Sequence, residues 1–416
     1  MLIISDHRRD GVRKSVNVLL CVVAVAGIGL SSTVLWQNLN GRHQINQACA
    51  GLVPAGRVLA LSPAGGTISH RVADEGTIQL DGGLPQDCEI FSTEAGEKHG
   101  TSSGERWFFT ATVGVQPSGE TWSPEDPLDH LVSPFSDDPT YPAEPLGGGI
   151  AGKVTASSVI VSLLCPEGTS SDKSTKGVWA RASLMDPGPA FLEEGQLTSQ
   201  DRNTLAEITV GTANNFAEYL GCADRLPDPP EDIPALTEGP IPAARADGTC
   251  AWYGKAGFAR QRQLPDQALE SRTHGTLWDE QCGLTLSDTR ANDLWESNAA
   301  KTEGLARPSD PADWYVSLHT YAGDAAKNVY LKSNNDDLPV AAEPGEAGRS
   351  DRSAWWASSQ CDGKPQIHTM TVSYGYNQLT IPALEKVFRA YVTDVVARRG
   401  CKDTKFPASS TFHADQ

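Results

Sequence analysis

Basic residues are scarce in this sequence, which argues against a nucleic-acid-binding protein. The chain has 34 Lys and Arg against 52 Asp and Glu in 416 residues, giving a formal net charge of −18. Neutralising a phosphate backbone requires basic side chains gathered on one face. Hydrophobic residues make up 39% and charged residues 21%, a balance unlike that of a disordered acidic tail. We therefore expect a folded protein of two or three domains that does not bind nucleic acid.

Close pairs of metal-binding residues are absent as well. The sequence has no C-x-x-C pair and no H-E-x-x-H, the local ligand pairs of many zinc sites. The histidines are scattered; His319 and His368 fall in strand-like stretches, and we interpret both as core or surface residues. The acidic pairs at 137–138 and 336–337 lack the alternating ligands and central glycine of a calcium loop. We therefore predict no metal site and no cofactor.

Two short patterns typical of enzymes occur in the wrong context. Residues 100–104 match G-x-S-x-G, but a charged turn precedes them and a strand-like stretch follows, whereas the hydrolase motif needs a strand before and a helix after. Residues 147–152 match G-x-G-x-x-G, but a Pro-rich loop precedes them and strand-like residues follow in place of the helix of a dinucleotide site. Neither pattern predicts a site, and we assign no catalytic residue.

One long apolar run lies near the N-terminus. Residues 16–36 read VNVLLCVVAVAGIGLSSTVLW, with no charge. At about 1.5 Å per helical residue, the run can cross a hydrocarbon core of about 30 Å. The basic residues lie before it, at Arg8, Arg9, Arg13 and Lys14. Because positive charge stays on the cytoplasmic side, we expect a single-pass membrane protein with residues 1–15 cytoplasmic and the bulk of the chain extracytoplasmic.

Cleavage of this segment is the alternative, since a secretory signal has the same basic start and apolar middle. Residues 24–26 (AVA) resemble a cleavage site but lie in the middle of the run. A lipid anchor on Cys21 is less favoured, because Val18, Leu19 and Leu20 precede it instead of small residues. The sequence therefore favours an uncleaved anchor.

The remaining eight cysteines form two sets of four. They are Cys49, Cys88, Cys165 and Cys222, followed by Cys250, Cys282, Cys361 and Cys401. An even number in an extracytoplasmic segment indicates disulfides. If the bonds stay within each set, nine pairings are possible. Bonding the first cysteine to the second and the third to the fourth gives the shortest loops, and we favour that pairing.

Each set of cysteines accompanies the same succession of elements. A strand-like stretch follows the second cysteine (106–113 and 314–321), and another accompanies the third (178–184 and 367–374). An amphipathic helix, with apolar residues every three or four positions, then ends at a Gly-Cys pair whose cysteine is the fourth of the set. We infer a tandem duplication of an α+β domain, each copy a mostly antiparallel sheet with a C-terminal helix.

The remaining segments set the domain boundaries. We expect repeat 1 at 45–225, interrupted by a Pro-rich acidic insertion at 116–149, and repeat 2 at 247–403. Prolines are dense at 226–246, which favours a semi-rigid linker, and 404–416 form a polar, flexible tail. The aromatic residues of the insertion make it a candidate recognition loop, although a solvated excursion is the simpler interpretation.

The arrangement of an anchor, paired cysteines, strands and a terminal helix resembles the α+β domains of actinobacterial cell-envelope lipoproteins and membrane proteins of unknown function. The matching positions are the two sets of cysteines. The chain departs from the lipoprotein members because it lacks a lipobox and has two domains. The resemblance implies an α+β sandwich and an envelope location, and it implies no catalytic residue.

The sequence leaves three functions open. We favour a membrane-anchored extracytoplasmic binding or scaffolding protein, not an enzyme, whose partner is an unknown envelope protein or glycan. An envelope hydrolase with a dispersed site and a carrier of an apolar ligand are the alternatives. Trp278, Trp355 and Trp356 could stack on a sugar, although core packing is the simpler interpretation.

Overall fold

In the computed structural model, described residues are 6–71, 86–99, 104–117, 142–166, 169–170, 173–185, 192–193, 196–237, 239–275, 277–305, 307–308, 313–327, 329–331, 340–350, 354–373 and 375–413. In the first helix, side chains are described at 16–23 and from 35 onward. Residues 100–103 of the candidate motif at 100–104, most of the insertion at 116–149 and both acidic pairs therefore lie outside the described residues.

The first half of the chain forms a large antiparallel sheet with one long helix against it. Its strands follow the order β1-β2-β3-β8-β6-β5-β4, and β7 pairs with the end of β8. The elements are α1 (Asp6–Ala48), α2 (Ala55–Val58), β1 (Ile68–His70), β2 (Gln86–Ser92), α3 (Thr93–His99), β3 (Arg106–Pro117), β4 (Glu144–Pro145), β5 (Gly152–Val154), β6 (Ser158–Leu164), β7 (Thr169–Ser170), β8 (Lys173–Leu184), β9 (Leu192–Glu193), β10 (Gln196–Leu197) and α4 (Ser199–Tyr219).

The second half repeats this composition of a large antiparallel sheet and a long helix. Its sheet has the order β11-β12-β13-β14-β19-β18-β17, and β20 pairs with β18. The elements are β11 (Ile241–Pro242), η4 (Ala243–Arg245), α5 (Ala251–Lys255), η5 (Phe258–Arg260), β12 (Gln267–Glu270), β13 (Asp279–Thr285), α6 (Asp288–Trp295), α7 (Asn298–Thr302), β14 (Tyr315–Ala322), η7 (Ala325–Lys327), β15 (Tyr330–Leu331), β16 (Val340–Ala341), β17 (Gly348–Arg349), β18 (Ala354–Cys361), β19 (Lys364–Val372), α8 (Tyr376–Arg399), β20 (Lys402–Lys405) and η8 (Ser409–Phe412).

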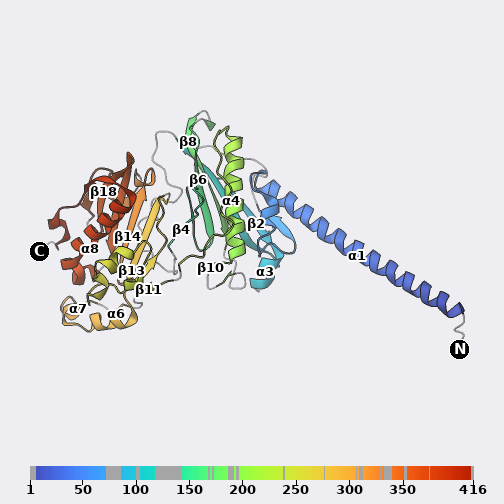
Figure 1. Ribbon diagram of the computed structural model, residues 1–416, viewed down its shortest axis with the longest axis horizontal. Helices are drawn as coiled ribbons and strands as arrows, with labels where there is room; N and C mark the ends of the chain where they lie inside the picture. Colours follow the sequence, from blue (N-terminus) through green and yellow to red (C-terminus); the bar gives the residue numbers. More distant parts are fainter. Residues whose placement is uncertain are drawn as a thin grey trace.

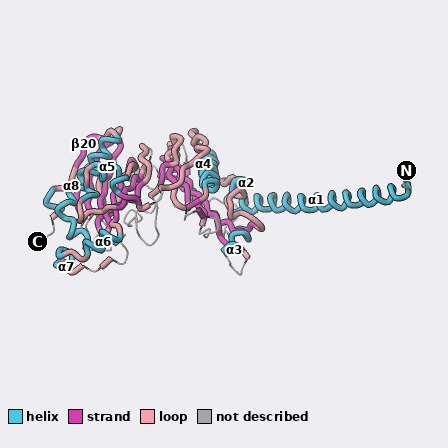
Figure 2. Tube along the Cα trace, turned by 60° about the horizontal axis from the view of Figure 1, so that its bottom comes forward, coloured by secondary structure: helices cyan, strands magenta, loops and turns pink. Residues whose placement is uncertain are grey.

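The two large sheets lie between the two long helices. Figures 1 and 2 show α4 on the side of the first sheet that faces away from the second half, and α8 on the opposite outer side of the second sheet. The helix α1 runs away from this body and touches it only through its C-terminal part (Figure 1). The chain is therefore an α+β protein with mostly antiparallel sheets, as the sequence predicts.

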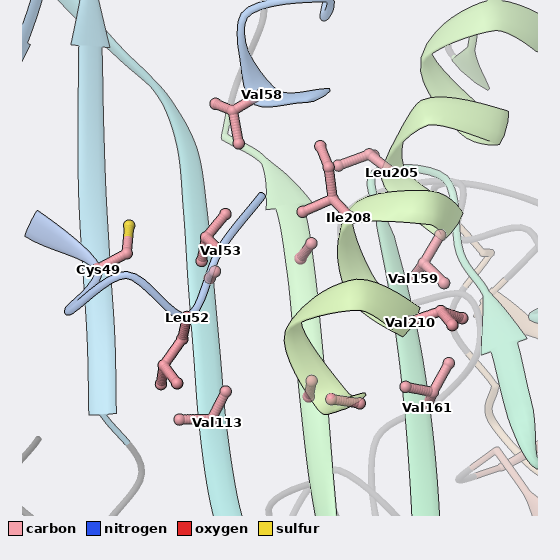
Figure 3. Close-up of a cluster of buried hydrophobic side chains, with 14 of the residues drawn as sticks. Cys49, Leu52, Val53, Val58, Val113, Val159, Val161, Leu205, Ile208 and Val210 are labelled. Carbon is pink, nitrogen blue, oxygen red and sulfur yellow. The ribbon is translucent and has the colours of Figure 1, made fainter. Parts of the chain in front are cut away.

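The core of the first half lies between its sheet and α4. The helix places Leu205 and Ile208 against Val159 and Val161 of β6, and the turn after α1 adds Val53 (Figure 3). These positions recur every three or four residues on the helix and every second residue on the strand, so one face of each element is apolar. Thr198 caps the start of α4, because its hydroxyl accepts a hydrogen bond from the backbone N–H of Asp201 at 3.1 Å.

The second long helix differs from its predicted start. We expected Thr380 to cap it, but α8 begins at Tyr376, and the Thr380 hydroxyl donates to the Tyr376 carbonyl at 3.0 Å within the first turns. Its end is as predicted, because Gly400 has φ 65°, the left-handed conformation that terminates a helix.

Four disulfides are present, in the pairing that the shortest-loop argument favoured. They are Cys49–Cys88, Cys165–Cys222, Cys250–Cys282 and Cys361–Cys401, with Cα–Cα distances of 5.1, 5.2, 5.3 and 4.1 Å. In each half, the first bond joins a helical segment to a strand of the sheet: the end of α1 to β2 in the first half, and the start of α5 to β13 in the second. The other bond joins the end of β6 or β18 to the end of α4 or α8.

Two segments are more tightly packed than their composition predicted. The Pro-rich linker does not stand free: Asn203 of α4 bonds to the backbone of Glu231 and Ile233, and the Ile233 side chain is buried in the first core. The tail, expected to be flexible, instead contains β20, and Phe412 stacks on Trp355 with ring centroids 5.2 Å apart.

Within the part of the chain whose side chains are described, no helix is both long and apolar enough to cross a membrane.

Candidate functional site

A cluster of buried polar side chains lies where the second sheet faces the first half of the chain. Side chains alternate along β14, so Leu318 and Thr320 point towards α8, whereas Ser317, His319 and Tyr321 point to the opposite face. Asp279, at the start of β13, reaches the same face, because the register places it directly opposite Tyr321. Strand alternation and register therefore bring a serine, a histidine and an aspartate together.

These three side chains form a hydrogen-bonded relay. The Ser317 Oγ lies 3.1 Å from His319 Nε2, and His319 Nδ1 lies 3.1 Å from Asp279 Oδ1. Since a carboxylate only accepts, Nδ1 carries the proton that binds Asp279, and the lone pair on Nε2 accepts the Ser317 hydroxyl proton. This is the tautomer and orientation that a general base beside a serine requires.

The remaining oxygen of Asp279 is occupied by other partners. Gln281 donates to Oδ2 at 2.7 Å, and the Lys153 ammonium, from β5 of the first half, lies 3.7 Å from the same oxygen. Lys153 also lies over the Trp278 ring, 5.7 Å from its centroid. All the polar groups of the relay are buried, and the lysine balances the aspartate charge, which a low-dielectric site requires.

A second ion pair joins the two halves. Here the acidic residue belongs to the first half and the basic residue to the second, the reverse of Lys153 and Asp279. Glu144 of β4 is fully buried, and its carboxylate accepts from the backbone N–H and the Nε of Arg272 at 3.0 and 2.9 Å. The Thr237 hydroxyl donates to its other oxygen at 2.9 Å. A third pair, Lys176 with Asp324, is more exposed. The two halves therefore hold each other through reciprocal charges.

The other buried histidine has different partners. His368 lies beneath α8, with Nδ1 2.9 Å from the Thr320 hydroxyl and Nε2 2.9 Å from the Ser359 hydroxyl. Burial, and secondarily the Arg399 charge, lowers the pKa of His368 to about 3. It therefore stays neutral and serves as a structural residue, in line with the interpretation from sequence.

A cleft of about 720 Å³ lies away from the relay, between residues 262–266 and the helices α6 and α7. Its wall is fixed by Arg290, which donates to the carbonyls of Ala259 and Leu264 at 2.9 Å each and lies 3.5 Å from Asp266. These contacts hold a loop to a helix, and they leave the cleft without a reactive arrangement of the kind found at Ser317.

The structure places the cysteines, two of the tryptophans and the glycine-rich segment that the sequence singled out. All eight cysteines are in disulfides, so none is a metal ligand or nucleophile. Trp355 and Trp356 are buried, as core packing predicted. Residues 147–149 form a turn with positive φ and lead into β5, so this glycine-rich segment does not open a helix. Among the described residues, no group of three His, Cys, Asp or Glu could hold a metal ion.

The relay of Ser317, His319 and Asp279 was not among the sites predicted from the sequence. Alternation in the predicted strand at 314–321 places Ser317 and His319 on one face, and that signal was available. Asp279 could not be found in the same way, because its position depends on the register between β13 and β14, which α6 and α7 separate in the chain.

Comparisons with models of protein families, with curated proteins and with solved structures find no match to this chain.

Proposed function

We propose that the chain is a membrane-anchored binding or scaffolding protein of the bacterial cell envelope, whose partner is an envelope protein or glycan. In this proposal, residues 16–36 cross the membrane and two related α+β units stand outside it. The observation that carries the proposal is the long α1, which extends away from the folded body (Figure 1). Its described side chains include many that are apolar and exposed.

The surface of α1 favours lipid over water. The exposed large apolar residues on this helix are Val16, Val18, Leu19, Leu20, Val22, Val23, Leu35, Trp36 and Leu39. Burying each valine or leucine side chain in hydrocarbon is worth roughly 1.5–3 kcal/mol, so leaving the whole set in water is costly. The uncharged sequence between Val23 and Leu35 continues the same character. A bilayer is the environment that would cover all sides of this helix at once.

The disulfides support the extracytoplasmic part of the proposal. Such bonds persist in oxidising compartments and are rare in the bacterial cytoplasm. All four lie after residue 48, which is the part that the basic N-terminus leaves outside the cell under the positive-inside rule.

The sheet orders support two related units. The path β1-β2-β3-β8-β6-β5 of the first sheet corresponds step by step to β12-β13-β14-β19-β18-β17 of the second. In both halves the long helix comes after all the strands of this path in the chain, and the disulfides join corresponding elements. Two unrelated domains would have to share strand order, helix position and both cross-links by coincidence, so duplication is the simpler account.

A fixed arrangement of two units suits a scaffold. Lys153 of the first unit and Asp279 of the second form a buried ion pair, and the buried Glu144 of the first unit pairs with the half-exposed Arg272 of the second. If one unit turned against the other, Lys153, Asp279 and Glu144 would be left as buried charges without partners. The units therefore present one composite surface, outside the membrane and strongly acidic.

Fractionation tests the anchor directly. Full-length protein should stay with membranes after alkaline carbonate washing, and external protease should digest the disulfide-bonded body in intact spheroplasts. A variant lacking residues 16–36 should be lost from the membrane fraction, whereas Cys21→Ser, which keeps the apolar run, should remain. Recovery of the full-length chain in the soluble fraction would refute the anchor. Proximity labelling from the C-terminus should then enrich a defined envelope partner, and labelling identical to that of an unrelated anchored domain would refute the scaffold.

A further inference from the structure

We propose that Ser317 is a nucleophile activated by His319, and that the chain hydrolyses a small acyl ester at this position. This activity goes beyond binding or scaffolding, and it rests on the relay and not on the membrane anchor.

The atoms of His319 that contact Ser317 and Asp279 are the ones that a serine nucleophile requires. A serine nucleophile needs the imidazole nitrogen that faces it to be unprotonated, and the opposite nitrogen to donate to a carboxylate. Ser317 contacts Nε2 and Asp279 contacts Nδ1, each at 3.1 Å. Asp279 keeps its charge beside Lys153 and Gln281, so it holds the imidazole in this tautomer.

His368, on the other face of the same sheet, has different hydrogen-bond partners from His319. The two nitrogens of that imidazole contact the hydroxyls of Thr320 and Ser359, its ring meets Tyr391 edge-on, and burial and the nearby Arg399 charge disfavour its protonation. His319 instead faces Asp279, so the imidazolium that forms during a proton transfer is stabilised. The Asp279 carboxylate has two contacts in this arrangement, because it pairs with Lys153 across the halves and also orients His319.

The reaction needs only the ester and water. The Ser317 Oγ bonds to the acyl carbon while its proton passes to His319 Nε2. The ester C–O bond then breaks, and the alkoxide leaves as an alcohol with that proton. Water attacks the acyl-serine, giving its proton to Nε2, and the carboxylic acid departs as the proton returns to Ser317.

The surroundings of Ser317 set the size of the acyl group. The register places Ser317 between Gly283 on β13 and Thr371 on β19. Gly283 adds no side chain to this face, and Thr371, which is half-buried, supplies a hydroxyl as a candidate donor to the developing oxyanion. Because Ser317 is only 3% exposed, the substrate that we propose carries a short acyl group such as acetyl.

The test uses the full-length protein in detergent with two probes, a fluorophosphonate and p-nitrophenyl acetate. Ser317 should become phosphonylated, as peptide mass mapping would show, and p-nitrophenol should be released with turnover. Ser317→Ala should abolish both. Ser358→Ala is the matched control, because Ser358 lies buried on the same sheet face with its Oγ unpartnered in hydrogen bonds; it should react like the unmodified chain.

A second pair of variants separates activation from folding. His319→Gln should slow phosphonylation about 100-fold or more, the usual contribution of a general base, with an unchanged unfolding midpoint. His368→Gln should leave the rate unchanged. No labelling of the folded protein, or equal labelling of His319→Gln, would overturn the proposal.

Discussion

The Lys153 ammonium lies 3.7 Å from Asp279 Oδ2, and solvent reaches only 2% and 3% of the two side chains. The lysine comes from β5 of the first half and the aspartate from β13 of the second, so the pair ties the halves together at a buried point. The same aspartate orients His319. One carboxylate therefore connects the packing of the two halves to the geometry at Ser317.

Removing the lysine charge should destabilise the whole chain. Lys153→Met keeps most of the side-chain volume but leaves the Asp279 charge buried without its cation. Breaking a buried ion pair from one side costs about 3–5 kcal/mol. The free energy of unfolding in urea, measured on the full-length protein in detergent, should fall by about that amount.

The matched control for this change is Lys176→Met. Lys176 also pairs across the halves, with Asp324, but about a third of its side chain is exposed. Exposed pairs contribute about 1 kcal/mol or less, so this variant should unfold nearly as the unmodified chain does. Equal losses for the two variants would mean that burial of Lys153 does not determine its contribution.

The disulfides should each contribute comparable stability. Their loops span 57 residues for Cys165–Cys222 and 32 for Cys250–Cys282, and the chain-entropy estimate gives about 4 kcal/mol for each. Replacing both cysteines of one pair by alanine should lower the unfolding free energy accordingly. Cys21→Ser, which touches no disulfide, should have no effect. Mass mapping without reduction should find these four pairs and a single free thiol; a mixed pairing would contradict the structure.

Local pattern predicted much of the fold, and contacts between distant segments account for what it missed. The strands at 106–113 and 314–321 and both long helices followed from alternation and periodicity, and loop length indicated the disulfide pairing. The composition of the Pro-rich linker predicts semi-rigid backbone, but it does not reveal that Asn203 of α4 bonds to that backbone. Phe412 is a lone aromatic residue in a polar tail, and only the fold shows Trp355 beneath it. The relay likewise depends on a contact between distant segments, because the register between β13 and β14 brings Asp279 to His319.

A cross-strand glycine should tolerate no side chain. Gly114 of β3 pairs directly with Trp179 of β8, and a Cβ on Gly114 would lie 2.5–2.8 Å from the indole ring. The tryptophan covers the glycine, a recurring device in antiparallel sheets. Gly114→Ala should therefore overpack the sheet and cost about 1–3 kcal/mol in urea unfolding. At Gly275, where a Cβ would meet nothing within 4 Å, alanine should change stability far less.

The buried imidazole of His368 should make stability depend on pH. Burial and the nearby Arg399 lower the pKa of His368 in the folded chain from its usual 6.5 to about 3. On acidification, the unfolded chain therefore takes up a proton near pH 6.5, while the folded chain does so only near pH 3. Between these values the unfolded state binds more protons, so stability falls as the pH falls, by at most about 1.4 kcal/mol per pH unit from this group.

His368→Gln isolates this contribution. Glutamine can still exchange hydrogen bonds with Thr320 and Ser359 but takes up no proton, so the slope of unfolding free energy between pH 4 and 6 should become shallower by about one proton. His413→Gln, at an exposed position, should leave the slope unchanged. Because the comparison uses slopes, a uniform loss of stability in His368→Gln does not affect it. An unchanged slope would show that His368 takes up its proton equally readily in the folded and unfolded chains, contrary to its enclosure by hydroxyls beneath α8.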